Sequence, residues 1–377
     1  MPSLNSYAQK FNQGFYFFKG RVALYALLKA LGIGADDEVI IQAFTCLAVP
    51  SAVLWLDAKP VFTDIDPNTY NIDASKVEEK ITRRTKAIIA QHTYGVPAEM
   101  DPICALARAN NLYVIEDACH AVGSTYKGKK TGFLSDAAFF SFGWGKPITC
   151  GIGGCVVVNN SDIEKKMKDI YGLFHKPPLS DSGIVFLEYI AYQLLLNPSL
   201  FWFIRNMYRL CARYGLIGAT FSPEELDLNM PDKYKRKMPA LQQKLVQRKI
   251  RSLQHAIDHR RWVASKYATL LSHLGIQPQK VPDYSHPVYT RYPILVRNKQ
   301  QLLDKAQQQN IEIGDWYMSP IHPLQKKDWA KVGYQNGSCP VAEDVCTKLV
   351  HLPTYENIKK KDIARICDLI ASQSSIL

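Results

Sequence analysis

Two residues of opposite charge stand where this chain could hold an organic cofactor. Lys146 follows Ser141 by five residues in FFSFGWGKPITCGIGG, and Asp117 ends the apolar run of LYVIEDACH. A lysine amine can hold the aldehyde of pyridoxal phosphate covalently, and a carboxylate can keep the pyridine nitrogen of that cofactor protonated, so that the ring accepts electrons. The pairing of Lys146 with Asp117 therefore indicates pyridoxal phosphate chemistry.

Positioning these residues requires a sheet, and the sequence predicts one. Short β-branched runs alternate with helical stretches between residues 20 and 160. The runs lie at 38–44, 60–65, 86–92, 112–118, 137–142 and 153–158. This alternation predicts an α/β domain whose mostly parallel central sheet is sandwiched by helices, with ligands at the carboxyl ends of the strands. Asp117 stands at one such end.

The pattern changes in the second half of the chain. A long helical stretch begins near residue 239, and a strand near 289–296 is followed by helical segments near 299–310 and 341–350. We therefore expect a large domain over 1–255 and a smaller α+β domain over 256–377. The segment from about 176 to 233 resembles neither neighbour and is expected to be an insertion in the large domain.

Composition narrows the class of protein. The net charge of +12 would suit nucleic acid, an anionic membrane or phosphorylated substrates. The sequence contains no zinc-finger, RNA-binding or helix-turn-helix pattern, so we expect no nucleic-acid partner. Its nine cysteines form neither a CxxC pair nor a metal-ligand spacing, and no metal is expected. The N-terminus does not read as a secretory signal, which favours the cytoplasm.

Several segments, taken in order, resemble the DegT/StrS family of sugar aminotransferases, pyridoxal phosphate enzymes of the aspartate aminotransferase fold (fold type I). They are ALLKALGIGADDEVI, AKPVFTDIDPNTYNID, TRRTKAIIAQHTYGVPAEMD, VIEDACHAVGSTYKGKKTG, SFGWGK and CPVAEDVCTKLVHLPTYENI. An ordered series of this kind is far more specific than a single motif. The resemblance implies a homodimer that moves an amino group, with glutamate as the donor, to an activated, nucleotide-linked keto-sugar. Its setting would be the synthesis of surface polysaccharide or lipopolysaccharide.

The resemblance also assigns roles to residues. Lys146 would anchor the cofactor and, once released by the amino donor, would carry a proton during the transfer. Asp117 would pair with the pyridine nitrogen, and His120 would contact the phenolic oxygen. Ser141 would bind the phosphate. From the residues alone, Lys146 could instead be a surface lysine, Asp117 a helix cap and His120 a buried polar side chain.

The second half of the phosphate site would be the start of the first long helix. There the residues Gly20, Arg21 and Val22 offer backbone N–H groups to an anion. The family reads Ser-Gly-Thr-Ala at this point, whereas this chain reads Lys-Gly-Arg-Val and lacks the threonine hydroxyl. Arg21 either binds the phosphate in its place or is a solvated residue of the first helical turn.

Other positions depart from the family pattern. Cys46 stands where an aromatic residue commonly stacks on the cofactor, and Ile152 stands where an acid is common. The basic run 235–237 replaces an Asn-x-Arg stretch that reaches the neighbouring subunit's phosphate; it either meets that phosphate or is a solvated charge run. In GDWYMSPIHP, Trp316, Tyr317 and His322 lie near where the family lines its substrate pocket.

The inserted segment carries a second hypothesis. Residues 184–221 are dense in aromatic residues and leucine, and Asn197, Pro198 and Ser199 divide them into two short helical arms. Each arm is shorter than the roughly 20 residues that a transmembrane helix needs. Arg205, Arg209 and Arg213 recur every four residues in the second arm. This composition fits a helix that lies in the plane of a membrane, and equally a hairpin that packs on the enzyme or at a dimer interface.

Two other functions remain open from the sequence. A pyridoxal phosphate-dependent sugar dehydratase would use the same sheet and cofactor, but such an enzyme can lack the anchoring lysine, so Lys146 argues against it. A non-catalytic, membrane-associated regulator that retains the fold is favoured by Cys46, by Ile152 and by the altered phosphate loop.

Overall fold

The central element is a sheet of seven strands in the order β1-β10-β9-β6-β5-β2-β4. The computed structural model describes residues 4–195, 198–213, 225, 228–276 and 278–372. The strands are β1 (Phe15–Phe17), β2 (Glu38–Gln42), β4 (Lys59–Thr63), β5 (Thr85–Gln91), β6 (Tyr113–Asp117), β9 (Ala137–Ser141) and β10 (Gly154–Val158). All neighbours from β9 to β4 are parallel, whereas β10 and β1 join antiparallel at one edge. The predicted, mostly parallel sheet is therefore confirmed, and each predicted run coincides with a strand to within two residues.

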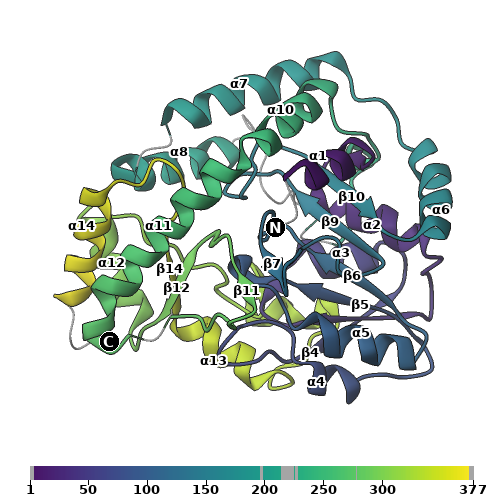
Figure 1. The fold of residues 1–377 in the computed structure, drawn as a ribbon, viewed down its shortest axis with the longest axis horizontal. Coiled ribbons are helices and arrows are strands. Elements are labelled where there is room, and N and C mark those ends of the chain that lie inside the picture. The colour runs from purple at the N-terminus through teal and green to yellow at the C-terminus, as the bar shows by residue number, and fades with distance from the viewer. Residues whose placement is uncertain (1–3, 196–197, 214–224, 226–227, 277, 373–377) are drawn as a thin grey trace.

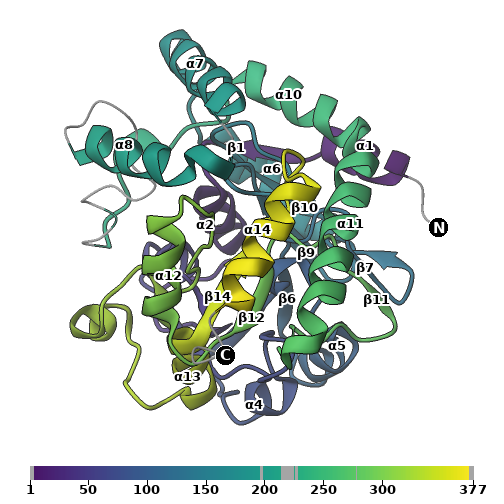
Figure 2. The same cartoon turned by 90° about the vertical axis from the view of Figure 1, so that its left-hand side faces the viewer.

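Helices cover both faces of this sheet (Figures 1 and 2). On one face lie α2 (Gly20–Ala30), α3 (Ala48–Leu54) and α6 (Ser161–Gly172); on the other lie α1 (Leu4–Asn12), α4 (Ala74–Glu78), α5 (Met100–Ala109) and α10 (Ala240–Arg251). The strand residues alternate accordingly, since Ile41 faces the first layer and Ile40 faces the second. Burial on both faces explains why the strands read as continuous apolar runs.

The C-terminal part forms a smaller layer around a two-stranded antiparallel sheet, β12 (Tyr292–Leu295) and β14 (Leu349–Leu352). The helices around it are α11 (Leu253–Leu271), α12 (Lys299–Gln308) and α14 (Lys360–Ala371), whereas the buried residues of α13 (Pro340–Lys348) pack into the core of the large sheet. The long helical stretch predicted from residue 239 is divided at Ser252, where α10 ends and α11 begins. The domain boundary expected at 255/256 falls in the first turn of α11, and it remains a prediction.

Two small ribbons connect the layers. The first joins β7 (Thr125–Tyr126) to β8 (Lys129–Lys130) and to β11 (Ser285–His286). The second pairs β3 (Thr45–Cys46) with β13 (Ile321–His322), which run parallel with His322 opposite Cys46. This second ribbon carries residues of the C-terminal part to the edge of the large sheet.

The predicted insertion contains two helices, α7 (Leu179–Leu195) and α8 (Phe201–Arg213), joined through the short helix η2 (Pro198–Leu200). Figure 2 shows both at the rim of the molecule. The division into two arms is therefore confirmed. Among the described residues, no helix is long and apolar enough to cross a membrane. Of the predicted arginine repeat, Arg205 packs its guanidinium 4.0 Å from the centre of the Trp202 ring, whereas the side chains of Arg209 and Arg213 lie outside the described part.

Candidate active site

The sheet brings the predicted cofactor residues to one edge. Asp117 is the last residue of β6 and Ser141 is the last of β9. Asp117 is paired with Gln91, the last residue of the parallel strand β5. Because the carboxyl ends of parallel strands share an edge, side chains that follow these strands converge there.

Asp117 is buried and held by its own turn. The Cys119 backbone N–H donates to Asp117 Oδ1 at 3.0 Å. Burial raises the pKa of the Asp117 carboxyl, and the charge of Lys146 opposes that rise. A buried carboxylate with a cation beside it at a strand end is suited to pair with a positively charged ring nitrogen.

Lys146 and His120 are in direct contact, with Lys146 Nζ 2.8 Å from His120 Nε2. Burial, followed by the charges of Lys146 and Arg291, holds the pKa of His120 well below its usual value, so the ring is neutral. A neutral imidazole that accepts from the lysine at Nε2 carries its proton on Nδ1. That Nδ1 is buried and has no hydrogen-bond partner among the described residues, so it can donate to a bound group.

The opposite end of the site is formed where α2 begins beside β9. A Cβ atom placed on Gly20 would lie 2.8 Å from Ser141 Cβ and 3.1 Å from Ser141 Oγ. Lys19 precedes the helix without a side-chain capping hydrogen bond. A hydroxyl beside a helix N-terminus is a ready phosphate site, because N–H groups of the first turn lack partners within the helix.

Arg21 and Val22 lie at this helix start but are engaged elsewhere. The Arg21 guanidinium forms an ion pair with the fully buried carboxylate of Glu225, which also lies 3.6 Å from Lys19 Nζ and accepts a 2.6 Å hydrogen bond from Tyr234. The Val22 N–H donates to the Lys19 carbonyl at 3.1 Å, and its side chain is in the core. Arg21 is thus neither a solvated residue nor a cation without a counter-charge.

These residues fit pyridoxal phosphate. Among the described residues, the structure offers an amine, a buried carboxylate, an unpartnered imidazole nitrogen and a hydroxyl beside a helix start, which are the kinds of group that the cofactor's functional groups require. Lys146 would hold the aldehyde carbon, Asp117 the ring nitrogen, His120 the phenolic oxygen, and Ser141 with Gly20 the phosphate. When bound, the cofactor would supply an electron-accepting ring, and Lys146 would be placed to move the proton at the reacting carbon.

The β3–β13 ribbon places the predicted substrate residues beside this site. Tyr317 is buried, with its ring centre 5.1 Å from that of Phe44 and 5.8 Å from that of His322. Burial lowers the pKa of His322 to about 4, and none of the described residues forms a hydrogen bond with its Nδ1. Cys46 is paired with His322 across this ribbon, and its place at the stacking position of the cofactor stays a prediction. The roles of Tyr317 and His322 remain predictions.

Aromatic rings surround His120: Trp316 was expected near the substrate pocket, whereas Tyr94 had no expected role. Trp316 lies nearly parallel to the His120 ring at 5.9 Å between centres, and Tyr94 does so at 6.2 Å. Trp316 stood in the GDWYMSPIHP motif and Tyr94 in QHTYG, so their motifs gave a signal. The guanidinium carbon of Arg291 lies 5.5 Å from the Trp316 ring centre. No motif in the sequence indicated that Arg291 would lie so close.

The inserted helix α7 also reaches this region. The Tyr192 ring lies 4.5 Å from that of Trp144, in the loop that carries Lys146. Burial raises the pKa of the Tyr192 hydroxyl, and Arg291 and the Gly145 amide oppose that rise. The insertion therefore contributes to the surroundings of the anchoring lysine.

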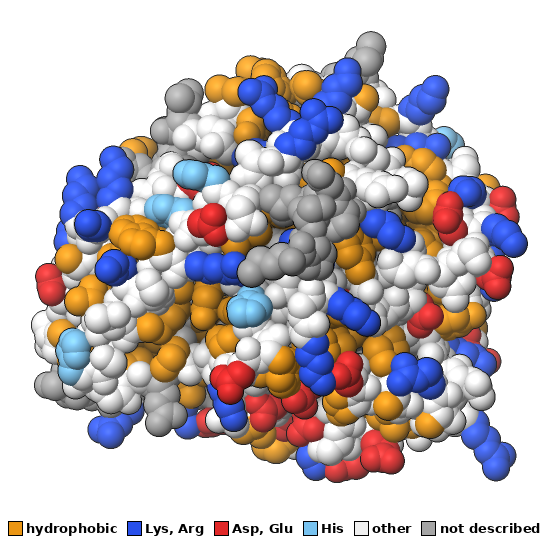
Figure 3. Space-filling view, in the orientation of Figure 1, with side chains coloured by type: hydrophobic (Ala, Val, Ile, Leu, Met, Phe, Trp, Pro, Cys, Tyr) orange, Lys and Arg blue, Asp and Glu red, His pale blue; other side chains and the backbone are white. Residues whose placement is uncertain are grey.

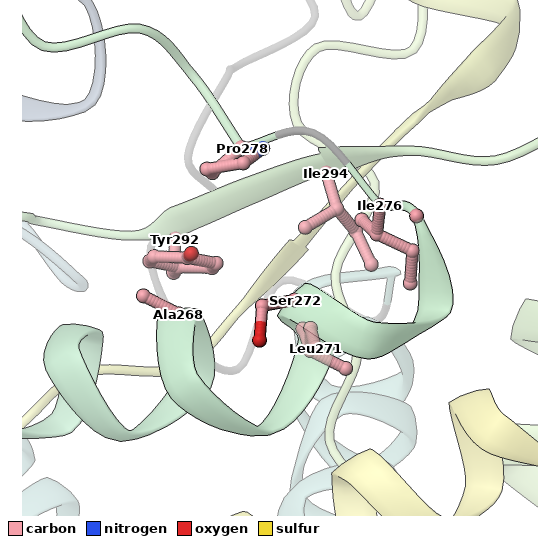
Figure 4. Close-up of a pocket in the computed structure, with 8 residues that line it drawn as sticks. Ala268, Leu271, Ser272, Ile276, Pro278, Tyr292 and Ile294 are labelled. Carbon is pink, nitrogen blue, oxygen red and sulfur yellow. The ribbon is translucent and has the colours of Figure 1, made fainter.

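A separate pocket lies in the C-terminal part (Figure 4). It is lined mainly by apolar side chains of α11 and β12, including Leu271, Tyr292 and Ile294. Its described lining residues carry no carboxylate, imidazole or amine, which distinguishes it from the site around Lys146.

Comparison with known proteins places this geometry in a family. The model of the DegT/DnrJ/EryC1/StrS aminotransferase family matches residues 16–183 and 225–371. The chain belongs to this family. The match leaves out residues 184–224, which lie within the insertion predicted over about 176–233. The resemblance inferred from the sequence is therefore confirmed, as are the aminotransferase class and pyridoxal phosphate as the cofactor.

Individual family members are similar over different lengths. A GDP-perosamine synthase of Caulobacter vibrioides is 50% identical over 153 residues, which is 41% of each chain. A GDP-perosamine synthase of Escherichia coli O157:H7 is 29% identical over 385 residues, covering 98% of this chain and 91% of the relative. The solved structure of DesV from S. venezuelae, in complex with a ketimine intermediate, has a TM-score of 0.74 at 25% identity and covers 100% of this chain and 90% of its own. The predicted fold is thus confirmed.

Proposed function

We propose that this protein transfers an amino group, with glutamate as the donor, to a nucleotide-linked keto-sugar destined for surface polysaccharide or lipopolysaccharide. The observation that carries the proposal is the contact of Lys146 with His120 beside the buried Asp117, in a member of an aminotransferase family. Relatives named GDP-perosamine synthase support a nucleotide-linked sugar as the acceptor.

Borohydride reduction followed by peptide mass spectrometry tests the anchor. We expect the reduced cofactor on Lys146 in the wild type and none in Lys146→Ala. Lys166→Ala, which removes an exposed lysine of α6, serves as the matched control and should keep the modification at Lys146. Cofactor attached mainly to another lysine would overturn the assignment.

The reaction itself is tested with GDP- and UDP-linked keto-sugars. Glutamate should convert the cofactor to its amine form in the absence of sugar, and a keto-sugar should then restore the original visible absorbance. This two-stage behaviour is expected of a ping-pong enzyme. Irreversible loss of the sugar's hydroxyl without net amino transfer would instead identify a dehydratase. A protein that never binds the cofactor would be the non-catalytic regulator.

We further propose that the enzyme is a homodimer in the cytoplasm. Support comes from the position of the basic run 235–237, which stands where the family carries the stretch that reaches the neighbouring subunit's phosphate. This run lies next to the start of α2, since the Phe18 N–H donates to the Arg236 carbonyl at 3.0 Å. Light scattering on the purified protein should give twice the chain mass. A fully active monomer would refute the proposal that the basic run of one subunit meets the phosphate of its neighbour.

The insertion supports a finer proposal, that α7 and α8 rest on the inner face of an anionic membrane. Exposed large apolar side chains gather on these two helices and the turn between them: Leu187, Ile190, Leu200, Phe203, Met207 and Leu210. Phe203, Met207 and Leu210 follow helical spacing and share one face of α8. Figure 3 shows Lys and Arg side chains beside hydrophobic ones along the edge where α7 and α10 lie. Apolar surface next to positive charge is typical of a helix lying on anionic lipid.

Flotation with liposomes of phosphatidylglycerol tests the membrane proposal. The wild type should float with anionic vesicles and the double variant Phe203→Ser/Met207→Ser should not, while Leu270→Ser, at an exposed position of α11, should behave like the wild type. If the double variant floats normally but loses its dimeric state, the face is a subunit interface instead.

A further inference from the structure

A second cation stands beside the anchoring lysine. Arg291 precedes β12 and is half-buried. Its guanidinium carbon and Lys146 Nζ each lie 5.5 Å from the centre of the same Trp316 ring. A Cβ atom on Gly145 would be 3.2 Å from Arg291 Nη2. The guanidinium therefore lies against the backbone of the residue that precedes Lys146.

This guanidinium has unused hydrogen-bonding capacity. Arginine has five N–H donors. Nη1 donates to the Thr290 carbonyl at 3.1 Å, whereas Nε is buried and has no partner in the part of the chain that the structure describes. Among the residues described in the structure, no carboxylate lies within ion-pair distance of Arg291. A fork of donors without a resident anion, next to the reacting amine, is suited to bind a carboxylate with two hydrogen bonds.

The surroundings of Arg291 are mainly cationic or neutral. Its charge lowers the pKa values of His120, His351 and Arg260, in each case after burial as the larger cause. A nearby acid, Glu312, is buried and accepts a hydrogen bond from Tyr355 at 2.5 Å. Burial raises the pKa of Glu312 to about 7, so that it balances the positive charge only in part. An incoming anion would therefore relieve an unbalanced charge.

We propose that Arg291 binds a carboxylate group of the substrate while the reacting carbon lies at Lys146. This inference rests on the proposed function and deepens it, because it names a charged substrate group and the residue that recognises it. A carboxylate can come from the amino donor or from an acidic sugar. In both cases Arg291 is a specificity-determining residue, and no bond to it forms or breaks.

Binding measurements on the cofactor-loaded enzyme separate the two sources. Calorimetry with glutarate, a dicarboxylate without an amine, measures whether the enzyme binds the carboxylate of the amino donor. A comparison of UDP-glucuronate with UDP-glucose reports an acidic sugar. Arg291→Met should lower either the affinity for glutarate or the preference for UDP-glucuronate over UDP-glucose. The expected loss is roughly ten- to hundredfold, the range for hydrogen bonds to a charged group. Arg291→Lys should keep part of the affinity, since it keeps the charge but loses the fork.

Arg297→Met is the matched control, because Arg297 is exposed beyond the end of the same strand. It should bind every probe like the wild type. Thermal unfolding and the visible spectrum check that Arg291→Met folds and holds the cofactor; if it does not, Arg291→Gln takes its place. Equal affinities of wild type and variant for all probes would overturn the subsite. That outcome differs from failure of the proposed function, in which the wild type itself would not exchange an amine with glutamate.

Discussion

At the scale of single residues, burial sets the charge states that the site needs. Asp117 and His120 are both buried, but Lys146 acts on them in opposite directions: its charge favours the ionised carboxylate and disfavours the protonated imidazole. The charge of Lys146 thereby favours an ionised Asp117, which suits a protonated ring nitrogen, and a neutral His120, which can accept a hydrogen bond from the Lys146 amine.

The Asp117→Asn variant tests the role of that charge. An amide keeps the size of the side chain but cannot hold a proton on the ring nitrogen, so amino transfer should fall by roughly 10²–10³-fold. Stability should not fall, because burial of the carboxylate is itself unfavourable. Single-turnover rates with glutamate, together with thermal unfolding, measure both effects. A variant of normal rate would mean that Asp117 only caps its turn.

Local motifs predicted some site residues, and distant contacts could not be predicted. Lys146, Asp117 and Ser141 follow strands whose apolar runs are visible in the sequence. The ion pair of Arg21 could not be predicted in this way, because its partner Glu225 lies 204 positions away in the sequence. Arg291 likewise reaches the site only through packing of the C-terminal part on the large sheet. Contacts of this kind depend on tertiary structure and leave no periodic signal.

At the scale of elements, the phosphate end depends on how closely α2 approaches β9. The approach requires a residue without a side chain, since any Cβ on Gly20 would press against Ser141. Strands and helices were predictable because two-sided burial gives long apolar runs. β14 was not predicted as a strand: its four residues directly follow α13, and so short a run reads as the end of that helix.

Gly20→Ala should therefore weaken the cofactor site. The overlap of the new methyl group with Ser141 should cost about 1–3 kcal/mol, or displace the hydroxyl and weaken phosphate binding. Gly172→Ala, at a helical glycine of α6 with open space around it, should be neutral or slightly stabilising. Cofactor titration and urea unfolding compare the two. Equal behaviour of both variants would argue against a tight α2–β9 contact.

At the scale of the whole molecule, the buried acid Glu312 makes stability depend on pH. Its folded pKa is about 7, which is above the usual 4.5. A group with a raised pKa contributes its full stability below the unfolded pKa, and that contribution is lost as the pH rises through the folded pKa. The wild type should therefore lose stability between about pH 4.5 and pH 7 through this residue.

Glu312→Gln should remove this pH dependence. Relative to the wild type, the variant should gain up to about 3 kcal/mol between pH 5 and pH 8, the free-energy equivalent of the pKa difference. Glu78→Gln, at an exposed acid of α4, should leave the wild-type slope unchanged. Urea unfolding at both pH values measures this. Parallel pH profiles for all three proteins would show that Glu312 is ionised in the folded state.

The insertion has one further consequence. Helix α7 exposes Leu187 and Ile190, while its Val185 is buried and Tyr192 rests on Trp144, beside the anchor. Because a helix moves largely as a unit, a partner that binds the exposed residues of α7 would also displace Tyr192 and the loop that carries Trp144 and Lys146. Under the proposed membrane binding, attachment through α7 would therefore shift the loop next to Lys146, and turnover would differ between the membrane-bound and the free enzyme.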